Sequence, residues 1–250
     1  MTKKWMVCGL AALLAGAAYA EPIRTVLTKE NRLPRLYQLE AGSEFFYQEL
    51  DSGGDIVSGI PYLRYTLFRD FALFGKLPYH RIDPDMGSSE SGVGDASLGF
   101  EFVPYEDLFG YPWVMAHAEV IFDNGNEDKG LGTGETEYMV GVAVGTTQNR
   151  VLHYALDARY MILDDQDNIP SIAGSIVWDL DRRFSLMAEL ELSREKGRDE
   201  FGQDDDTHPL VFMVGMFYKA TPNLYFMLNG GTTKNSDVKE IVRGKIAYTF

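Results

Sequence analysis

The sequence has a single cysteine, Cys8, and this scarcity excludes intrachain disulfide bonds and thiolate metal sites. Basic residues are also few, because 23 Lys and Arg stand against 37 Asp and Glu and leave a formal net charge of −14. A protein that binds nucleic acid needs a basic face, so this balance argues against nucleic acid as a partner.

Long apolar runs are absent beyond the first 20 residues, so we expect no transmembrane helix there. The chain also has no Pro/Ser-rich linker and no shift in composition that would separate two domains. A nucleotide-binding loop is missing as well, which favours a passive function over one driven by ATP.

The first 20 residues have the three parts of a secretory signal peptide. Lys3 and Lys4 precede an apolar run, and small residues end it at Ala18-Tyr19-Ala20. A membrane-anchoring helix is the alternative, but the run falls short of the ~20 residues that spanning requires. We therefore predict a signal peptide over 1–20, followed at 21–34 by an N-terminal extension that either plugs the barrel described next or hangs in the periplasm.

Segments of about ten residues that alternate apolar and polar side chains recur along the rest of the chain, with Gly, Asp, Asn and Pro between them. They number twelve: 35–49, 56–68, 71–82, 92–103, 113–122, 135–146, 151–162, 169–179, 183–194, 209–219, 223–233 and 241–250. Twelve is even, as a bacterial single-chain barrel requires. The pattern predicts an all-β fold, a closed antiparallel transmembrane β-barrel of twelve strands in an up-and-down meander over 35–250.

The connections between these segments alternate in length, as the turns and loops of such barrels do. The expected periplasmic turns are 69–70, 104–112, 147–150, 180–182 and 220–222. The expected outer loops are 50–55, 83–91, 123–134, 163–168, 195–208 and 234–240. Because 104–112 is long for a turn and rich in aromatic residues, we expect it to form a small aromatic cap.

The last segment ends on Phe250, and a terminal aromatic residue on an alternating strand is similar to the terminal signature of bacterial outer-membrane proteins. This places the protein in the outer membrane of a Gram-negative envelope. The expected partners are outer-membrane lipids and lipopolysaccharide, the barrel-insertion machinery through Phe250, and a small-molecule solute.

Charged residues whose parity points inward predict the lining of the lumen and the solute path. These are Glu40, Glu44, Arg64, Lys76, Asp95, Glu101, Asp157, Arg159, Arg243 and Lys245. The same parity turns inward His80, His117, Glu119, Glu137, Asp179, Glu189, Glu191 and Lys219. Arg64, Lys76, Arg243 and Lys245 are expected to oppose Glu40 and Glu44 on neighbouring strands. Two interpretations stay open, a structural network that neutralises itself and a constriction that selects small anionic or aromatic solutes.

The segment Gly92-Val93-Gly94-Asp95-Ala96-Ser97-Leu98-Gly99-Phe100-Glu101-Phe102 contains the most specific motif. Its residues place an inward Asp95 beside two glycines, which favour a bend, a bulge or a close strand approach. The segment resembles the Gly-x-Gly-Asp-x-x-Leu-Gly strand of the outer-membrane transporter family named for the meta-pathway of phenol degradation. That resemblance implies an outer-membrane barrel that takes up aromatic or other small apolar compounds.

An outer-membrane enzyme that hydrolyses lipid or peptide is the alternative, as is a purely structural envelope protein. An Asp/His pair would use His80 with Asp83 or Asp85, or His208 with 204–206, whereas His117 and His153 have no serine on the same face two residues away. We expect no catalytic residues and no cofactor.

A metal site is not expected either. Asn124, Asn126, Asp128 and Glu135 fit positions of a calcium-loop template, but Lys129 occupies the position of its glycine. Two acidic stretches, 164–167 and 204–206, are expected to be solvated outer loops that could share divalent cations with lipopolysaccharide. The sequence therefore predicts a passive outer-membrane channel or transporter for a small, aromatic or hydrophobic solute.

Overall fold

The computed structural model describes residues 25, 27–29, 36–51, 53–85, 87–106, 112–163, 168–198 and 204–250, with the backbone alone at 195–198 and 204–206. The strands are β1 (Leu39–Leu50), β2 (Gly54–Phe68), β3 (Phe71–Lys76), β4 (Tyr79–Pro84), β5 (Glu90–Val93), β6 (Ser97–Glu106), β7 (Trp113–Ile121), β8 (Glu137–Gln148), β9 (Leu152–Ile162), β10 (Ile169–Asp179), β11 (Phe184–Ser193), β12 (Glu195–Arg198), β13 (Asp204–Thr207), β14 (Leu210–Lys219), β15 (Leu224–Lys234) and β16 (Val238–Thr249). One short 3-10 helix, η1 (Glu127–Lys129), follows β7.

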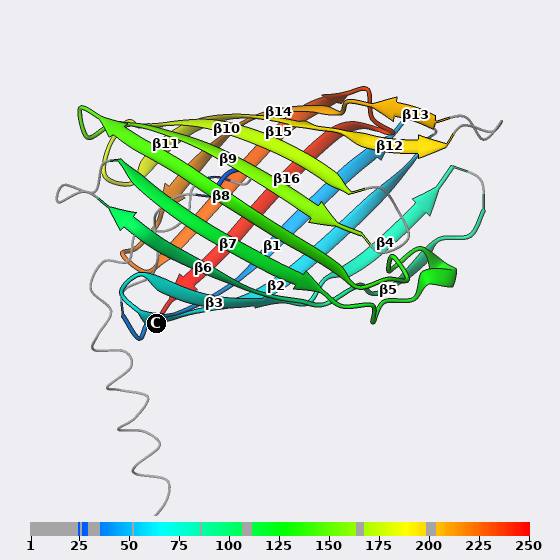
Figure 1. Cartoon of the computed structure of the whole chain (residues 1–250), viewed down its shortest axis with the longest axis horizontal. Coiled ribbons are helices and arrows are strands. Elements are labelled where there is room, and N and C mark those ends of the chain that lie inside the picture. Colours follow the sequence, from blue (N-terminus) through cyan, green and yellow to red (C-terminus); the bar gives the residue numbers. More distant parts are fainter. Residues whose placement is uncertain are drawn as a thin grey trace, which may run out of the picture.

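The main sheet closes on itself, because β1 pairs antiparallel with both β2 and β16 (Figure 1). Strands β3 and β4 both pair with β2, and together they form one interrupted barrel strand. Strands β5 and β6 pair with β4 and β3, and they form the next interrupted barrel strand. The hairpin of β12 and β13 is a separate two-stranded sheet between β11 and β14. The predicted closed meander of twelve antiparallel strands is confirmed.

Two strands are interrupted where the sequence indicated one continuous segment. The break at Leu77 and Pro78 follows from the chemistry of proline, which has no N–H to donate to a ladder. The second break, at 94–96, lies in the Gly-x-Gly-Asp motif. The first predicted strand was also too long at its start, since residues 36–37 form a turn with Tyr37 at a φ of 61°.

The two ends of the barrel differ in their connections. One end, which we call the terminal end, holds Leu39, Phe250 and tight turns such as Arg69-Asp70 and the Asn149-Arg150 turn, whose two residues have φ of 53° and 61° (left side of Figure 1). The other, the loop end, holds the longer loops and the hairpin. The predicted aromatic cap at 104–112 is wrong for its first three residues, which continue β6; residues 107–111 lie outside the described part.

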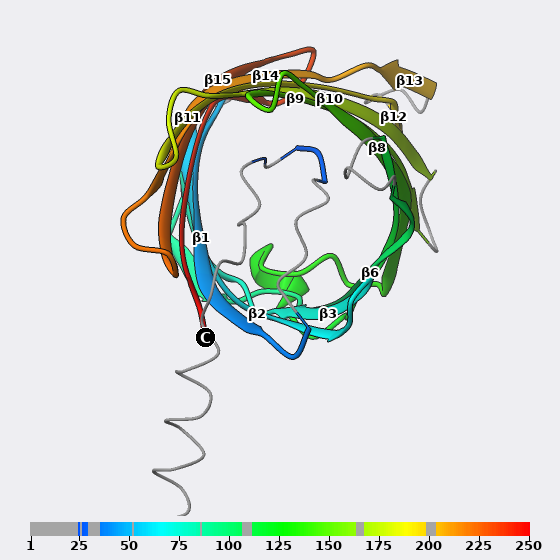
Figure 2. The same cartoon turned by 90° about the vertical axis from the view of Figure 1, so that its left-hand side faces the viewer.

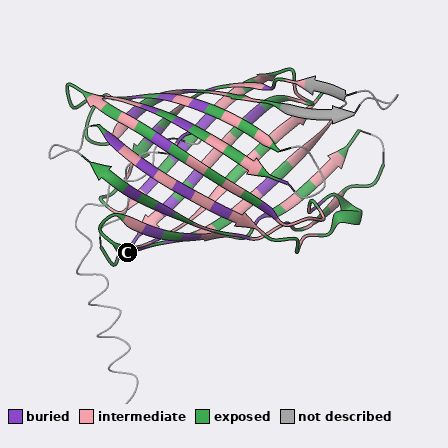
Figure 3. Ribbon diagram, viewed as in Figure 1, coloured by how far each residue is buried: buried purple, intermediate pink, exposed green. Residues whose placement is uncertain are grey.

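The two faces of the wall are chemically opposite, and buried residues alternate with more exposed ones along the long barrel strands in Figure 3. The outer face carries large apolar side chains such as Leu156, Ile172 and Trp178, which are 55%, 50% and 50% exposed. The inner face carries charged residues such as Glu101, Asp157 and Glu189 at 2% or less. An apolar exterior with a polar interior is the pattern of a barrel surrounded by lipid. Among the described residues, no helix has the length and apolar character needed to cross a membrane.

Candidate functional site in the barrel lumen

Part of the N-terminal extension lies inside the lumen. The described residues 25 and 27–29, which we call the inner segment, are drawn in dark blue within the ring of strands in Figure 2. The Glu189 carboxylate on β11 accepts the backbone N–H groups of Leu27 at 2.7 Å and Thr28 at 3.3 Å. The Thr28 hydroxyl donates to Ser175 Oγ on β10 at 2.7 Å. Of the two places that the sequence left open for this extension, the described residues occupy the lumen.

Leu27 fixes the inner segment through apolar contact. Its side chain is 3% exposed and packs against Ala173, Met213 and Ile241 on three different strands. These wall residues share the inward face with the charged residues. The segment therefore combines backbone hydrogen bonds with burial of one aliphatic side chain.

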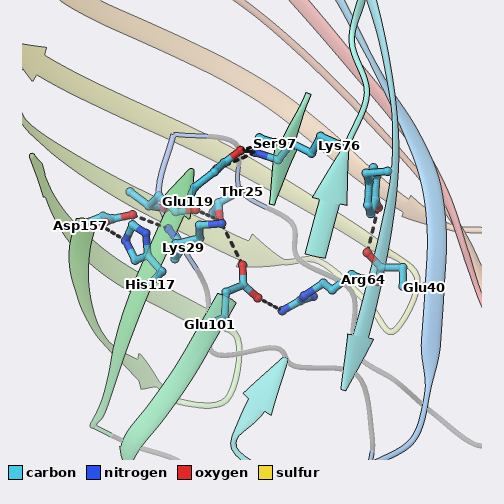
Figure 4. Close-up of polar contacts among 12 residues, drawn as sticks. Thr25, Lys29, Glu40, Arg64, Lys76, Ser97, Glu101, His117, Glu119 and Asp157 are labelled. Atoms are coloured by element: carbon cyan, nitrogen blue, oxygen red, sulfur yellow. Dashed lines mark hydrogen bonds and ion pairs between the residues drawn. The ribbon is translucent and has the colours of Figure 1, made fainter. Parts of the chain in front are cut away.

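Lys29 brings a positive charge into the centre of the lumen (Figure 4). Its Nζ lies 2.8 Å from Glu101 Oε1 and 4.9 Å from the centre of the Phe74 ring. Arg64 Nη2 lies 2.5 Å from the other oxygen of the same carboxylate. The backbone N–H of Lys29 donates to Asp157 Oδ2 at 3.0 Å. Glu101 thus joins two cations, as a buried carboxylate needs.

Two further carboxylates near Glu101, those of Glu119 and Asp157, also have polar partners. Lys76 Nζ binds both oxygens of Glu119, at 2.9 and 3.0 Å, and Ser97 donates to the same carboxylate at 2.5 Å. His117 Nε2 lies 2.9 Å from Asp157 Oδ1, with both side chains 1% exposed. The set of Lys29, Arg64, Lys76, Glu101, Glu119 and Asp157 is called the central cluster below.

The predicted opposition to Glu40 and Glu44 is in register at two of four positions. Lys245 faces Glu44 in register and lies 3.3 Å from it. Arg64 is also in register with Glu40, but its ion pair is with Glu101, and the oxygen of Glu40 accepts from the Tyr62 hydroxyl at 2.8 Å.

Lys76 and Arg243 are not in register with either carboxylate. Lys76 binds Glu119 on β7, which lies two strands from β3 on one side, whereas β1 lies two strands from β3 on the other. Arg243 lies over the Phe46 ring, 4.5 Å from its centre. Arg159 pairs with Glu191 at 2.6 Å, an ion pair on which the sequence made no prediction.

The Asp95 carboxylate binds the loop between β7 and β8. The carboxylate accepts the backbone N–H groups of Asn124 at 3.0 Å, Gly125 at 2.6 Å and Thr133 at 2.8 Å, and the Thr133 hydroxyl at 3.4 Å. These donors belong to residues 122–136 between β7 and β8, which we call the inward loop. Figure 2 shows η1, within this loop, inside the outline of the barrel.

The glycines of the motif leave room for the inward loop. A Cβ at Gly92 would lie 2.8 Å from Leu131 Cδ1, and a Cβ at Gly94 would lie 3.0 Å from Leu131 O and clash with the His80 ring. Leu131 itself is 4% exposed. The strand is interrupted at Gly94, as the glycines of the motif indicated. The inward loop packs on the lumen side of β5, and this explains why glycine is needed there.

An apolar lining at the terminal end was not predicted from the sequence, because only the charged inward residues were considered. On five strands a polar inward residue is followed, two positions nearer the terminal end, by a buried apolar one: Glu101 and Val103, His117 and Met115, Asp157 and Ala155, Ser175 and Val177, and Glu189 and Met187. Further apolar residues extend this level, which we call the apolar belt: Trp113, Ala143, Phe217, Tyr225, Met227 and Ala247. The same parity that identified the charges would have identified this belt.

The histidines do not form the Asp/His pairs of the enzyme alternative within the described residues. His80 Nδ1 lies 2.7 Å from Ser58 Oγ, whereas Asp83 pairs with Arg81 at 2.8 Å. The backbone carbonyl of His208 accepts from Asn235 at 3.4 Å, and the side chains of 204–206 lie outside the described part. No group of three or more His, Cys, Asp or Glu side chains in the described part is placed to hold a metal ion.

No family model matches the sequence, and no curated protein matches it. Solved structures do. The COG4313 outer membrane channel from Pseudomonas putida F1 is similar over 92% of this chain and 100% of its own, with 15% identity and a TM-score of 0.77. The KdgM porin in complex with disordered oligogalacturonate covers 84% of this chain and 99% of its own, with 12% identity and a TM-score of 0.61.

A third similar structure is the translocator domain of the autotransporter NalP from Neisseria meningitidis, with 10% identity and a TM-score of 0.57 over 99% of this chain and 95% of its own. At these identities the likeness concerns the fold, and membership of the phenol meta-pathway family stays a prediction. The closed sheet, the apolar exterior and these structures agree on one conclusion, that the chain is an outer-membrane β-barrel.

Proposed function

We propose that this barrel is a passive channel for small solutes with an aromatic or hydrophobic body. The observation that carries the proposal is the lumen itself, where a belt of Met, Trp, Phe, Tyr and Val side chains lies next to the central cluster. Two positions along a strand correspond to about 7 Å, so a solute of one aromatic ring would touch both levels. Binding sites for small molecules combine an apolar lining with a few polar groups in this way.

A structural comparison and a sequence resemblance support the proposed channel function. The similar structures include proteins described as an outer membrane channel and as a porin. The resemblance of the Gly-x-Gly-Asp segment to the phenol meta-pathway transporters points to aromatic or small apolar compounds as the solute.

Single-channel recording in planar bilayers tests the proposal. Purified full-length protein is expected to give discrete conductance steps in KCl, and proteoliposomes that contain it are expected to take up a neutral aromatic alcohol faster than a sugar of similar mass. A barrel that shows heat-modifiable migration, and is therefore folded, but remains electrically silent would contradict the channel function. Hydrolysis of lipid or peptide, lost in His80→Ala, would support the enzyme alternative instead.

The remaining partners are also proposals. Phe250 lies on the outer face at the terminal end, its ring 4.9 Å from that of Tyr248, and its N–H donates to the Leu39 carbonyl at 2.8 Å. We propose that the insertion machinery reads this residue and that lipid and lipopolysaccharide contact the apolar exterior. Deletion of Phe250 is expected to lower the yield of heat-modifiable barrel in outer-membrane fractions, and an unchanged yield would contradict this role.

A further inference from the structure

We propose that the position of the Lys29 ammonium is a binding site for a protonated amine that carries a small apolar group, and that the inner segment is its built-in competitor. This inference rests on the proposed channel function and names a class of solute for the same lumen.

The first support is the way in which the wall receives Lys29. Glu101 is 2% exposed and reaches the Lys29 Nζ at 2.8 Å, while the Phe74 ring lies 4.9 Å away on the same strand face as Lys76. A carboxylate beside an aromatic face is the arrangement that binds an organic ammonium group. Nothing in these two contacts requires that the ammonium belong to the protein chain.

The second support is the charge balance of the wall around this position. Among the described wall residues around the inner segment, Glu101, Glu119, Asp157 and Glu189 are acidic, and Arg64 and Lys76 are basic. Lys29 lies where these acidic side chains gather. A lumen lined by one sign of charge favours solutes of the opposite sign.

The third support is the place of the apolar belt. Val103 and Met115 lie two positions from Glu101 and His117 toward the terminal end, about 7 Å along each strand. An ammonium bound at Glu101 with its attached ring or short alkyl chain directed toward the terminal end would therefore pass from the charged level of the wall to the apolar one.

The inner segment competes for this site because it is part of the same chain. A ligand joined by a short linker has an effective concentration in the millimolar range, so a free amine must exceed that level to replace Lys29. Loss of the Lys29 charge is then expected to increase the apparent affinity for a free amine by about tenfold, since the competent site is no longer occupied most of the time.

Current block in planar bilayers tests the proposal with three probes of similar shape: 2-phenylethylamine, which is protonated at pH 7, neutral 2-phenylethanol and anionic 3-phenylpropionate. In Lys29→Ala and in Lys29→Met, which keeps an unbranched apolar chain, the amine is expected to block KCl current at about one tenth of the concentration needed for the native protein. The alcohol and the acid are expected to have no such effect. Adding Glu101→Gln to either variant is expected to abolish the block.

The matched control is Lys239→Ala, which removes one positive charge at the loop end, where Lys239 lies 3.5 Å from Glu49 and away from the central cluster. It is expected to behave as the native protein does. Heat-modifiable migration checks that every variant is folded. KCl current with equal block by all three probes, or with no block, would overturn the amine site and leave the channel function standing. No KCl current from any folded variant would overturn both.

Discussion

The inner segment and the inward loop both enter the lumen, and both are held by wall carboxylates that accept backbone N–H groups. They differ in how these contacts are distributed. The inward loop has four of its polar contacts on Asp95, which receives three N–H groups and a hydroxyl. Its other contacts with the wall include hydrogen bonds to the backbone of Ala96 and the ion pair of Lys129 with Glu90. The inner segment has its contacts spread over Glu189, Asp157 and Glu101, on three different strands.

This difference indicates different modes of release. A loop with four contacts on one carboxylate should lose most of its hold on the wall when that carboxylate is removed. A segment whose contacts lie on several carboxylates should lose its position by increments, because each contact can be removed while the others persist. The substitutions below test that contrast, and the largest effect is expected at Asp95.

Asp95→Ala is expected to release the inward loop. Four hydrogen bonds at about 1 kcal/mol each would change the ratio of docked to undocked loop by more than a hundredfold. Trypsin cleavage after Lys129, which is 48% exposed and pairs with Glu90 at 3.1 Å, should become rapid, and single-channel conductance should rise.

Asp123→Ala is the control for Asp95→Ala, because it removes the same charge from an exposed position in the loop that is not next to the cleavage site. It should leave both the cleavage rate and the conductance unchanged. Equal cleavage of native protein and Asp95→Ala would show that Asp95 does not hold the loop.

Leu27→Ala is expected to loosen the inner segment by removing its buried side chain. Burial of a leucine contributes about 2 kcal/mol, so the fraction of time for which the segment is out of place should increase about thirtyfold. The measurement is the frequency of high-conductance openings in long recordings. Leu63→Ala removes the same side chain from the outer face, where it is 56% exposed, and should not change that frequency.

How much of the structure the sequence predicts depends on whether period-two alternation and the order of strands fix the positions of the residues concerned. The twelve segments and the pairing of Glu44 with Lys245 follow from period-two alternation and from the order of strands, so both were predictable. The ion pair of Lys76 with Glu119 was not predicted, because β1 and β7 both lie two strands from β3 and the depth of each side chain decides between them.

The contacts of the inner segment could not have been derived from the alternation of apolar and polar residues. Glu189 lies 162 residues from Leu27 in the chain, and segment 21–34 has no alternation that fixes its register. The inward loop is the intermediate case. The Gly-x-Gly-Asp motif did indicate a bend and an inward carboxylate, but the need for glycine there is set by Leu131, some 40 residues away.

Glu189→Gln is expected to weaken the inner segment less than Leu27→Ala does. The amide keeps an oxygen that can accept an N–H group but loses its charge, a cost of about 1.4 kcal/mol or about tenfold in occupancy. Glu191→Gln, two positions along the same strand, breaks the 2.6 Å pair with Arg159 without touching the described inner segment. More frequent openings in Glu189→Gln than in Glu191→Gln would confirm the assignment, and equal frequencies would contradict it.

The smallest effect is expected at Arg243 and Lys245, which line the lumen on β16 outside the central cluster. Arg243→Glu and Lys245→Glu should raise the permeability of K⁺ relative to Cl⁻ by about two- to threefold at low salt, and less at 1 M KCl because of screening. Reversal at Lys245 should act more strongly, since it leaves Glu44 facing a like charge at a site that now holds an ion pair at 3.3 Å. Arg150→Glu, in an exposed turn at the terminal end, controls for net charge. If reversal potentials in the two lumen variants matched those of Arg150→Glu, neither side chain would face the conducting path, and the selective part of the lumen would have to be the central cluster alone.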